Sequence, residues 1–290
     1  MGFKRHKLHL VKENQAEGRI AEIYFEVRRT LGIPHVNVMF QAFASFPEFF
    51  DLFWTALKPI LETQEFFSFS ERLGAEAYTR VHNYFSVPDL RTKVTEMDFS
   101  AGAQNELQQV VDLYHYNYPA LLLVCAALLQ AFENPGSPQR QGTRPALHPA
   151  YSGHPVLVEE EVAPAPTRKI YEDMKRTLGT AFLATCYINF GRWPDFLKTY
   201  WDALKPMIKT ARYEQHRVAL RESALALAAE LPETLQLSTA QMEEQGVPEE
   251  DLNTVVHITD LFLNLLSQQV LNIAYAKIGL EDGITSKLAA

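Results

Sequence analysis

The sequence repeats itself at a distance of 147 residues, and this duplication limits the folds that the chain can adopt. The stretch Ala56-Leu57-Lys58-Pro59 recurs as Ala203-Leu204-Lys205-Pro206. Between Glu22 and Thr63, 15 of 42 positions are identical to their counterparts without a gap. Farther along, the spacing falls to 145, since Leu107 corresponds to Leu252. Such self-similarity indicates two copies of one structural unit.

The repeat divides the chain into three parts. We expect residues 1–132 to form a first unit and residues 167–290 a second, joined by a linker over 133–166. The linker contains seven prolines, at Pro135, Pro138, Pro145, Pro149, Pro155, Pro164 and Pro166. Because proline fixes φ and lacks an amide hydrogen, the linker is predicted to be irregular and mobile. Its length allows the units to pack face to face as an intrachain pseudo-dimer with a cleft between them.

Apolar residues within each unit follow helical spacing. Ile20, Ile23, Val27 and Leu31 recur at intervals of three and four, and Gly32 then supplies a stop signal. The second copy repeats this pattern. No pair of alternating apolar runs is joined by an Asn-Gly or Asp-Gly turn, so hairpins are not indicated. The sequence therefore predicts an all-α fold.

Composition excludes several classes of function. The net charge of −8 disfavours a nucleic-acid-binding protein, which usually carries a basic face. The two cysteines, Cys125 and Cys186, form no C-x-x-C pair, and a reduced, cytoplasmic protein is the simplest interpretation. The basic start of the chain is not followed by the apolar region of a signal peptide. The most apolar run, near Tyr118 to Phe132, is too short to span a bilayer.

Familiar catalytic signatures are absent, so no metal and no cofactor are predicted. The sequence has no Gly-rich phosphate loop, no H-E-x-x-H and no G-x-S-x-G. One segment, however, differs between the well-matched copies. Residues 33–42 and 180–189 share no identity, although both flanks match. Such a segment is either a loop free to diverge or a site that has been specialised.

Several features together resemble the DehI-like (group I) family of D,L-2-haloacid dehalogenases. They are the duplicated helical units, the long linker, the aromatic-Pro turns Phe46-Pro47 and Trp193-Pro194, and Tyr114-His115-Tyr116-Asn117-Tyr118-Pro119 before a Leu-rich run. The resemblance covers nearly the whole chain. It implies a pocket at the pseudo-dimer interface, where an aspartate activates water to displace halide directly from a 2-haloacid.

The same resemblance identifies site residues, and one of them departs from the family pattern. The family's Ser-Asp pair aligns with Thr185-Cys186, so a cysteine stands at the position of the catalytic aspartate. Pocket aromatics of the family align near His35 and Val38. A thiol, with a pKa of about 8.5, is a poor general base at neutral pH. Cys186 is then either a nucleophile assisted by His35, His115 or Asp260, or a small buried core residue.

Three functions remain open. The chain is a hydrolase of the 2-haloacid dehalogenase type, a small-ligand-binding protein without the chemistry, or a Cys186-dependent enzyme. In each case we expect a small carboxylic acid as ligand, no membrane partner and a possible homo-oligomer. The predicted catalytic residue is Cys186, and the predicted ligand-binding residues are His35, Asn37, Val38, Asn117, Thr185 and Tyr187.

Overall fold

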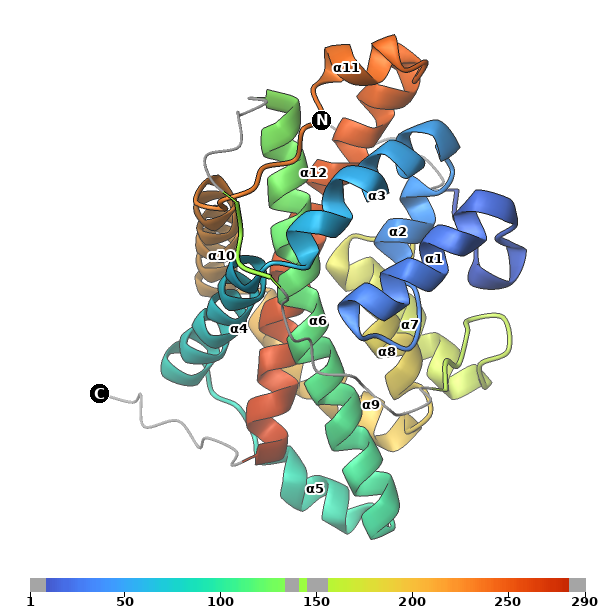
Figure 1. The fold of residues 1–290 in the computed structure, drawn as a ribbon. Coiled ribbons are helices and arrows are strands. Elements are labelled where there is room, and N and C mark those ends of the chain that lie inside the picture. Colours follow the sequence, from blue (N-terminus) through green and yellow to red (C-terminus); the bar gives the residue numbers. More distant parts are fainter. Residues whose placement is uncertain (1–8, 134–140, 145–155, 282–290) are drawn as a thin grey trace.

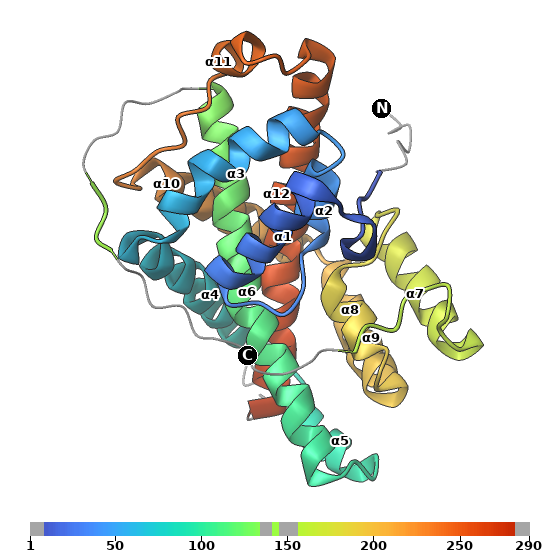
Figure 2. The ribbon, with the colours of Figure 1, turned by 45° about the vertical axis from the view of Figure 1, so that its right-hand side comes forward.

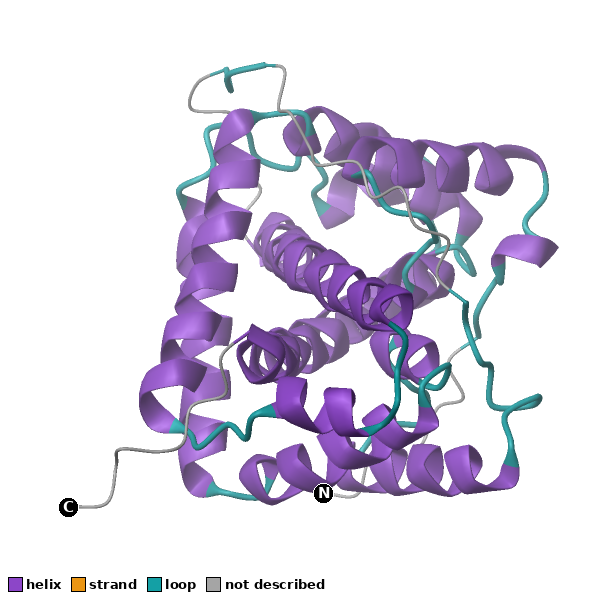
Figure 3. Cartoon of the chain, turned by 90° about the horizontal axis from the view of Figure 1, so that it is seen from below, coloured by secondary structure: helices purple, strands orange, loops and turns teal. Residues whose placement is uncertain are grey.

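A computed structural model describes residues 9–133, 141–144 and 156–281, and these contain helices and loops but no strand (Figure 3). The predicted all-α class is therefore confirmed. The elements of the first half are η1 (Glu13–Gln15), α1 (Gly18–Leu31), α2 (Val38–Phe43), α3 (Pro47–Leu61), α4 (Gln64–Tyr84), α5 (Leu90–Glu96) and α6 (Ala101–Glu133). Those of the second half are α7 (Ala165–Leu178), α8 (Thr185–Phe190), α9 (Pro194–Ile208), α10 (Ala211–Ala229), α11 (Thr239–Glu244) and α12 (Glu249–Glu281).

The helices of the second half repeat those of the first in order and nearly in length. α1 and α7 each have 14 residues, α3 and α9 have 15, and α6 and α12 have 33. α1 and α7 both end at a glycine in the left-handed region, Gly32 with φ 64° and Gly179 with φ 71°. A side chain would strain the backbone there, so these two glycines fix where both helices stop.

Hydrogen bonds recur at the same spacing as the sequence repeat. The indole of Trp54 and the ammonium of Lys58 both donate to Glu26, at 2.8 and 2.9 Å. In the second half, the pairs Trp201–Asp173 and Lys205–Asp173 repeat this arrangement at 2.8 and 2.6 Å. In both halves a carboxylate on the first helix thus anchors two residues of the third, which holds the helices in the same relative position.

The two long helices form the centre of the molecule. α6 and α12 lie side by side, and α4 and α10 pack against both (Figure 1). The contacts between halves are reciprocal, because α4 packs on α12 while α10 packs on α6. α5 and α11 lie at opposite ends of the molecule (Figure 2). Reciprocal contacts are characteristic of a two-fold interface, so they support the predicted pseudo-dimer arrangement.

The short helices also contact the other half reciprocally. α8 of the second half packs against α6 of the first, and α2 of the first packs against α12 of the second. These short helices and the turns before them are the segments in which the two copies diverge. The specialised segments therefore lie where the halves meet.

The linker prediction needs a correction at its end. α7 begins at Ala165, so Pro164 to Pro166 form the cap and first turn of a helix, where proline is tolerated. Much of the predicted linker lies outside the described residues. Its described residues 141–144 are held in place, since the amide of Gly142 donates to Glu233 at 2.7 Å and that of Thr143 donates to Glu65 at 2.9 Å.

Within the described part of the chain, no helix combines the length and apolar character needed to cross a membrane.

Candidate functional site

Cys186 lies at the start of α8 and faces the long helices. Its side chain is 2% exposed. Its amide donates to the hydroxyl of Tyr118 on α6 at 2.9 Å, and its thiol lies 3.8 Å from Oε1 of Gln269 on α12. Burial raises the pKa of the thiol to about 12, although the hydrogen bond with Tyr118 lowers it in part. A thiol with a pKa raised in this way is mostly protonated at neutral pH, which disfavours the predicted role of Cys186 as a nucleophile.

His35 lies in the turn before α2 and is 7% exposed. Its Nε2 is 3.4 Å from the hydroxyl of Tyr114, and the two rings are 5.8 Å apart. Tyr114 in turn packs against Tyr118, with ring centroids 5.1 Å apart. Burial lowers the pKa of His35 to about 4, so the imidazole is neutral at pH 7. His35 and Cys186 thus contact two neighbouring tyrosines of α6, Tyr114 and Tyr118.

Asn117 carries the strongest sign of a missing partner. The side chain is 1% exposed, and among the described residues neither its amide nitrogen nor its oxygen has a hydrogen-bond partner. Nδ1 of His35 is likewise buried and unpaired within that part of the chain. A buried polar atom left unpaired costs about 1–3 kcal/mol. Unpaired atoms on two residues of the predicted site are therefore expected to bind water or a ligand.

Asn37 and Val38 border a small cavity of about 30 Å³. Its wall also includes Tyr118, Phe182, Ala184, Phe262 and Gln269. The side-chain oxygen Oδ1 of Asn37 accepts a hydrogen bond from the backbone amide of Met39 at 3.0 Å, which caps α2. Asn37 thus has a structural role that the sequence interpretation did not assign. The cavity has room for one or two waters in its present form.

A larger cleft of about 400 Å³ adjoins this cavity, since Val38 and Phe182 line both. Seven pairs of residues 147 positions apart line it: Leu10 with Leu157, Lys12 with Glu159, Glu13 with Glu160, Asn14 with Glu161, Val36 with Leu183, Val38 with Thr185, and Gln41 with Ile188. Thr185, predicted to bind ligand, therefore faces this cleft. Both halves contribute equally to its wall. The carboxylates of Glu13 and Glu160 are paired with Arg28 and Lys175, which offsets their charge.

Tyr187 belongs to a different hydrogen-bond network. Its hydroxyl accepts from the amide of Asn272 at 2.9 Å, and Tyr213 donates to the same side chain at 2.7 Å. The side chains of all three residues are buried. Tyr187 lines neither of the spaces described above. Its hydroxyl thus has a partner within the second half, unlike the unpaired groups of His35 and Asn117.

The two other residues considered as bases for Cys186 contact other helices, although Nε2 of His115 is also buried and unpaired among the described residues. The ring of His115 packs against Tyr78 on α4, with centroids 6.4 Å apart. Asp260 accepts a hydrogen bond from Arg221 on α10 at 2.9 Å. Of the three candidate bases, His35 therefore has the most direct connection to the tyrosine pair.

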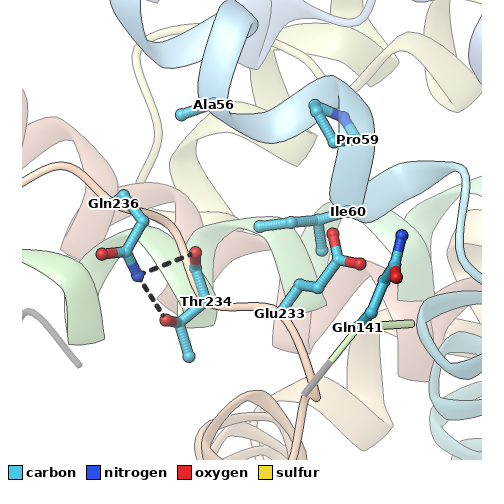
Figure 4. Close-up of a pocket in the computed structure, with 7 residues that line it drawn as sticks. All are labelled: Ala56, Pro59, Ile60, Gln141, Glu233, Thr234 and Gln236. Atoms are coloured by element: carbon cyan, nitrogen blue, oxygen red, sulfur yellow. Dashed lines mark hydrogen bonds between the residues drawn. The ribbon is translucent and has the colours of Figure 1, made fainter. Parts of the chain in front are cut away.

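Another pocket, of about 500 Å³, lies elsewhere (Figure 4). It is bounded by α3, residue Gln141 and the connection between α10 and α11. Its acidic residue, Glu233, accepts hydrogen bonds from Arg144 and from the amide of Gly142, both at 2.7 Å. The side chain of Gln236 bonds to Thr234. These polar groups already have partners, so this pocket is a weaker candidate for a catalytic site than the buried site around His35 and Asn117.

Sequence reasoning missed Tyr118 and Gln269. A signal existed for both. Tyr114, Asn117 and Tyr118 are spaced three and four residues apart, which places them on one face of a helix. Gln269 is a polar residue close to the apolar run Leu265-Leu266, and a buried polar side chain needs a partner. Among the described residues, no group of three His, Cys, Asp or Glu side chains could hold a metal ion.

Comparisons with known proteins bear on this site. Residues 34–187, slightly more than half of the chain, match the family described as halocarboxylic acid dehydrogenase DehI. An (R)-2-haloacid dehalogenase of Pseudomonas putida is 28% identical, over 92% of this chain and 91% of the relative. A configuration-inverting 2-haloacid dehalogenase of Pseudomonas sp. (strain 113) is 23% identical, over 96% and 93%.

A solved structure agrees with these sequence relatives. The complex of D-2-haloacid dehalogenase with L-LA has a TM-score of 0.90 and 26% identity, covering 96% of this chain and 98% of that one. The segment matched to the DehI family, residues 34–187, includes the turn that carries His35, the helix that carries Asn117 and the start of α8. The chain belongs to the DehI family.

Proposed function

We propose that this protein binds a small 2-substituted carboxylic acid between its two halves and hydrolyses a carbon–halogen bond at C2. Membership of the DehI family and the haloacid dehalogenases among its relatives support the reaction class. The observation that carries the proposal is the presence of buried, unpaired polar atoms on His35 and Asn117, two residues of the predicted site. Both lie within the segment matched to the family.

The proposed route of entry is the cleft shared by both halves. From there the acid reaches the tyrosine pair of α6 through the small cavity, whose wall contains Tyr118. At about 30 Å³ the cavity is too small for a haloacid, so binding must enlarge it toward His35 and Asn117. Side-chain rotations on binding are common, and the two unpaired residues favour such a change because the ligand would supply their missing partners.

Asn117 is proposed to hold the substrate through its amide. An amide group offers two N–H donors to a carboxylate and one oxygen acceptor to a water molecule. Displacement of halide by water requires a base and a water but no cofactor, and we propose none. Cys186 is proposed to form part of the wall of the binding site and to take no covalent part in the reaction. Its raised pKa leaves little thiolate for covalent chemistry.

The experiment measures halide release from the separate enantiomers of 2-chloropropionate, with affinity measured by calorimetry. Asn117→Ala is expected to weaken binding about tenfold or more, the effect of losing a charge-assisted hydrogen bond. Asn253→Ala changes an exposed asparagine and is the matched control, with no expected effect. Cys186→Ala is expected to retain both binding and halide release. Loss of activity in Cys186→Ala with an intact fold would favour the Cys186-dependent enzyme.

A second candidate function is binding without hydrolysis. It is favoured by the residue at the start of α8, because the family resemblance aligns Cys186 with the catalytic aspartate. Saturable binding of 2-chloropropionate without halide release would establish this function and contradict the hydrolase. Cys186→Asp then offers a further check, since a carboxylate at this position is expected to introduce slow release.

A further inference from the structure

We propose that His35 is the general base of the reaction, with its Nε2–H directed at Tyr114 and its Nδ1 lone pair directed at the attacking water. This inference rests on the proposed hydrolase function. It assigns to the turn before α2 the proton-accepting role that the family resemblance places at the start of α8.

The first support is the geometry of the imidazole. Nε2 is within 3.4 Å of the Tyr114 hydroxyl, whereas Nδ1 is buried and without a partner among the described residues. In a neutral imidazole one nitrogen carries hydrogen and the other a lone pair, and the hydrogen-bond partner of one selects the role of the other. Donation from Nε2 to Tyr114 leaves the Nδ1 lone pair free to accept a proton.

The second support comes from comparing the two halves. At the spacing of 147, His35 corresponds to Phe182. At the spacing of 145 that holds in the long helices, Asn117 corresponds to Phe262. The rings of Phe182 and Phe262 contact each other, with centroids 5.7 Å apart. The positions of His35 and Asn117 are therefore equivalent to those of two residues in contact.

The spacing of 145 is supported by a separate pair of contacts. Gly74 on α4 packs against the ring and carbonyl of His115 on α6. The counterpart of Gly74 at the spacing of 147 is Arg221, and that of His115 at the spacing of 145 is Asp260. These two side chains are in contact between α10 and α12, at 2.9 Å. One half therefore has an apolar aromatic pair where the other has a histidine and an asparagine with unpaired atoms. Two polar replacements at adjoining buried positions indicate a specialised site, since each alone would be costly.

The proposed reaction is a direct displacement of halide by water. The oxygen of water attacks C2 of the acid, and the carbon–halogen bond breaks with both electrons leaving on the halide. The water proton passes to Nδ1 of His35 and afterwards to solvent. The product is a 2-hydroxy acid of inverted configuration. The neutral imidazole can accept this proton at pH 7, and its pKa of about 4 is close to that of a carboxylate. An anionic substrate beside it would raise that pKa and strengthen the base.

Other ionisable groups surround this histidine. Tyr114 faces it from α6, and Cys186 is connected to it through Tyr118. Glu13 accepts a hydrogen bond from the amide of the adjacent Val36 at 2.6 Å and is paired with Arg28. Tyr118 and the thiol stay neutral through the range in which His35 titrates, because burial raises their pKa values. An acid limb of the rate is therefore expected from the titration of His35.

The test compares His35→Gln with His115→Gln in halide release. We expect kcat to fall about 100-fold or more in His35→Gln, with KM within about threefold of the wild type. His115→Gln replaces another buried histidine and is expected to retain the wild-type rate. Activity of His35→Gln within about threefold of the wild type would overturn the assignment of the base and leave the hydrolase intact. A wild type without halide release would overturn both proposals.

A second measurement covers the case in which His35→Gln does not fold. Nitrogen NMR of the ¹⁵N-histidine-labelled wild type distinguishes an imidazole nitrogen that carries hydrogen from one that carries a lone pair. We expect hydrogen on Nε2 of His35 and a lone pair on Nδ1. The opposite tautomer in the presence of 2-hydroxypropionate, used as a product probe, would overturn the proposal.

Discussion

Lowering the pH from 7 to 4.5 is expected to destabilise the folded protein by about 2–3 kcal/mol for each of two buried histidines. Burial lowers the pKa of His35 to about 4, and burial, with a contribution from Lys277, lowers that of His115 to about 4. In the unfolded chain a histidine has a pKa of about 6.5. Between these values the unfolded state binds more protons. The stability that these residues provide is thus complete above pH 6.5 and is lost as the pH falls toward 4.

Urea denaturation at pH 7 and pH 4.5 measures this loss. His115→Gln removes one titrating group, so the difference between the two pH values is expected to shrink by about 2 kcal/mol. His257→Gln replaces an exposed histidine and is the control, with the wild-type difference expected. Carboxylates that become protonated between pH 7 and pH 4.5 change the stability of all three proteins alike. An equal pH difference in wild type and His115→Gln would show that His115 is not buried in its neutral form.

Phe49→Ala is expected to lower the free energy of unfolding by about 3–5 kcal/mol. Phe49 on α3 has no exposed surface. Its ring stacks on Phe53 at 5.4 Å and meets the edge of Phe43 at 5.5 Å. Removing it leaves a cavity between α2 and α3 that neighbouring rings fill only in part. Phe43 belongs to α2, the helix that follows the turn carrying His35, so loss of the Phe49 ring is expected to disturb the site as well.

Phe25→Ala provides the matched comparison, because Phe25 lies on α1 with 58% of its surface exposed. Its expected effect is within about 0.5 kcal/mol. Denaturant titration followed by circular dichroism measures both variants. A loss below about 1 kcal/mol for Phe49→Ala would contradict the packing of α2 on α3.

The polar residues that were predicted from the sequence to bind ligand differ in the hydrogen-bond partners that the structure gives them. His35 and Asn117 were selected by divergence and by resemblance, and both are buried with unpaired atoms. Asn37 caps a helix, which accounts for its polar group. Tyr187 bonds to Asn272. Local sequence cannot separate these cases, because a polar residue in an apolar run looks the same whether its partner is an amide 85 residues away or a ligand.

The repeat and its helical periodicity determined the secondary structure and the order of the helices. Both are encoded locally, by spacings of three and four residues, by glycine stops such as Gly32 and by proline in first turns. Tertiary structure alone decided which residues share the site. His35 meets Tyr114 across 79 residues, and Cys186 meets Tyr118 across 68. The first contact lies within one half, whereas the second forms because α8 packs on α6 of the other half. Burial at both places decides which groups are charged.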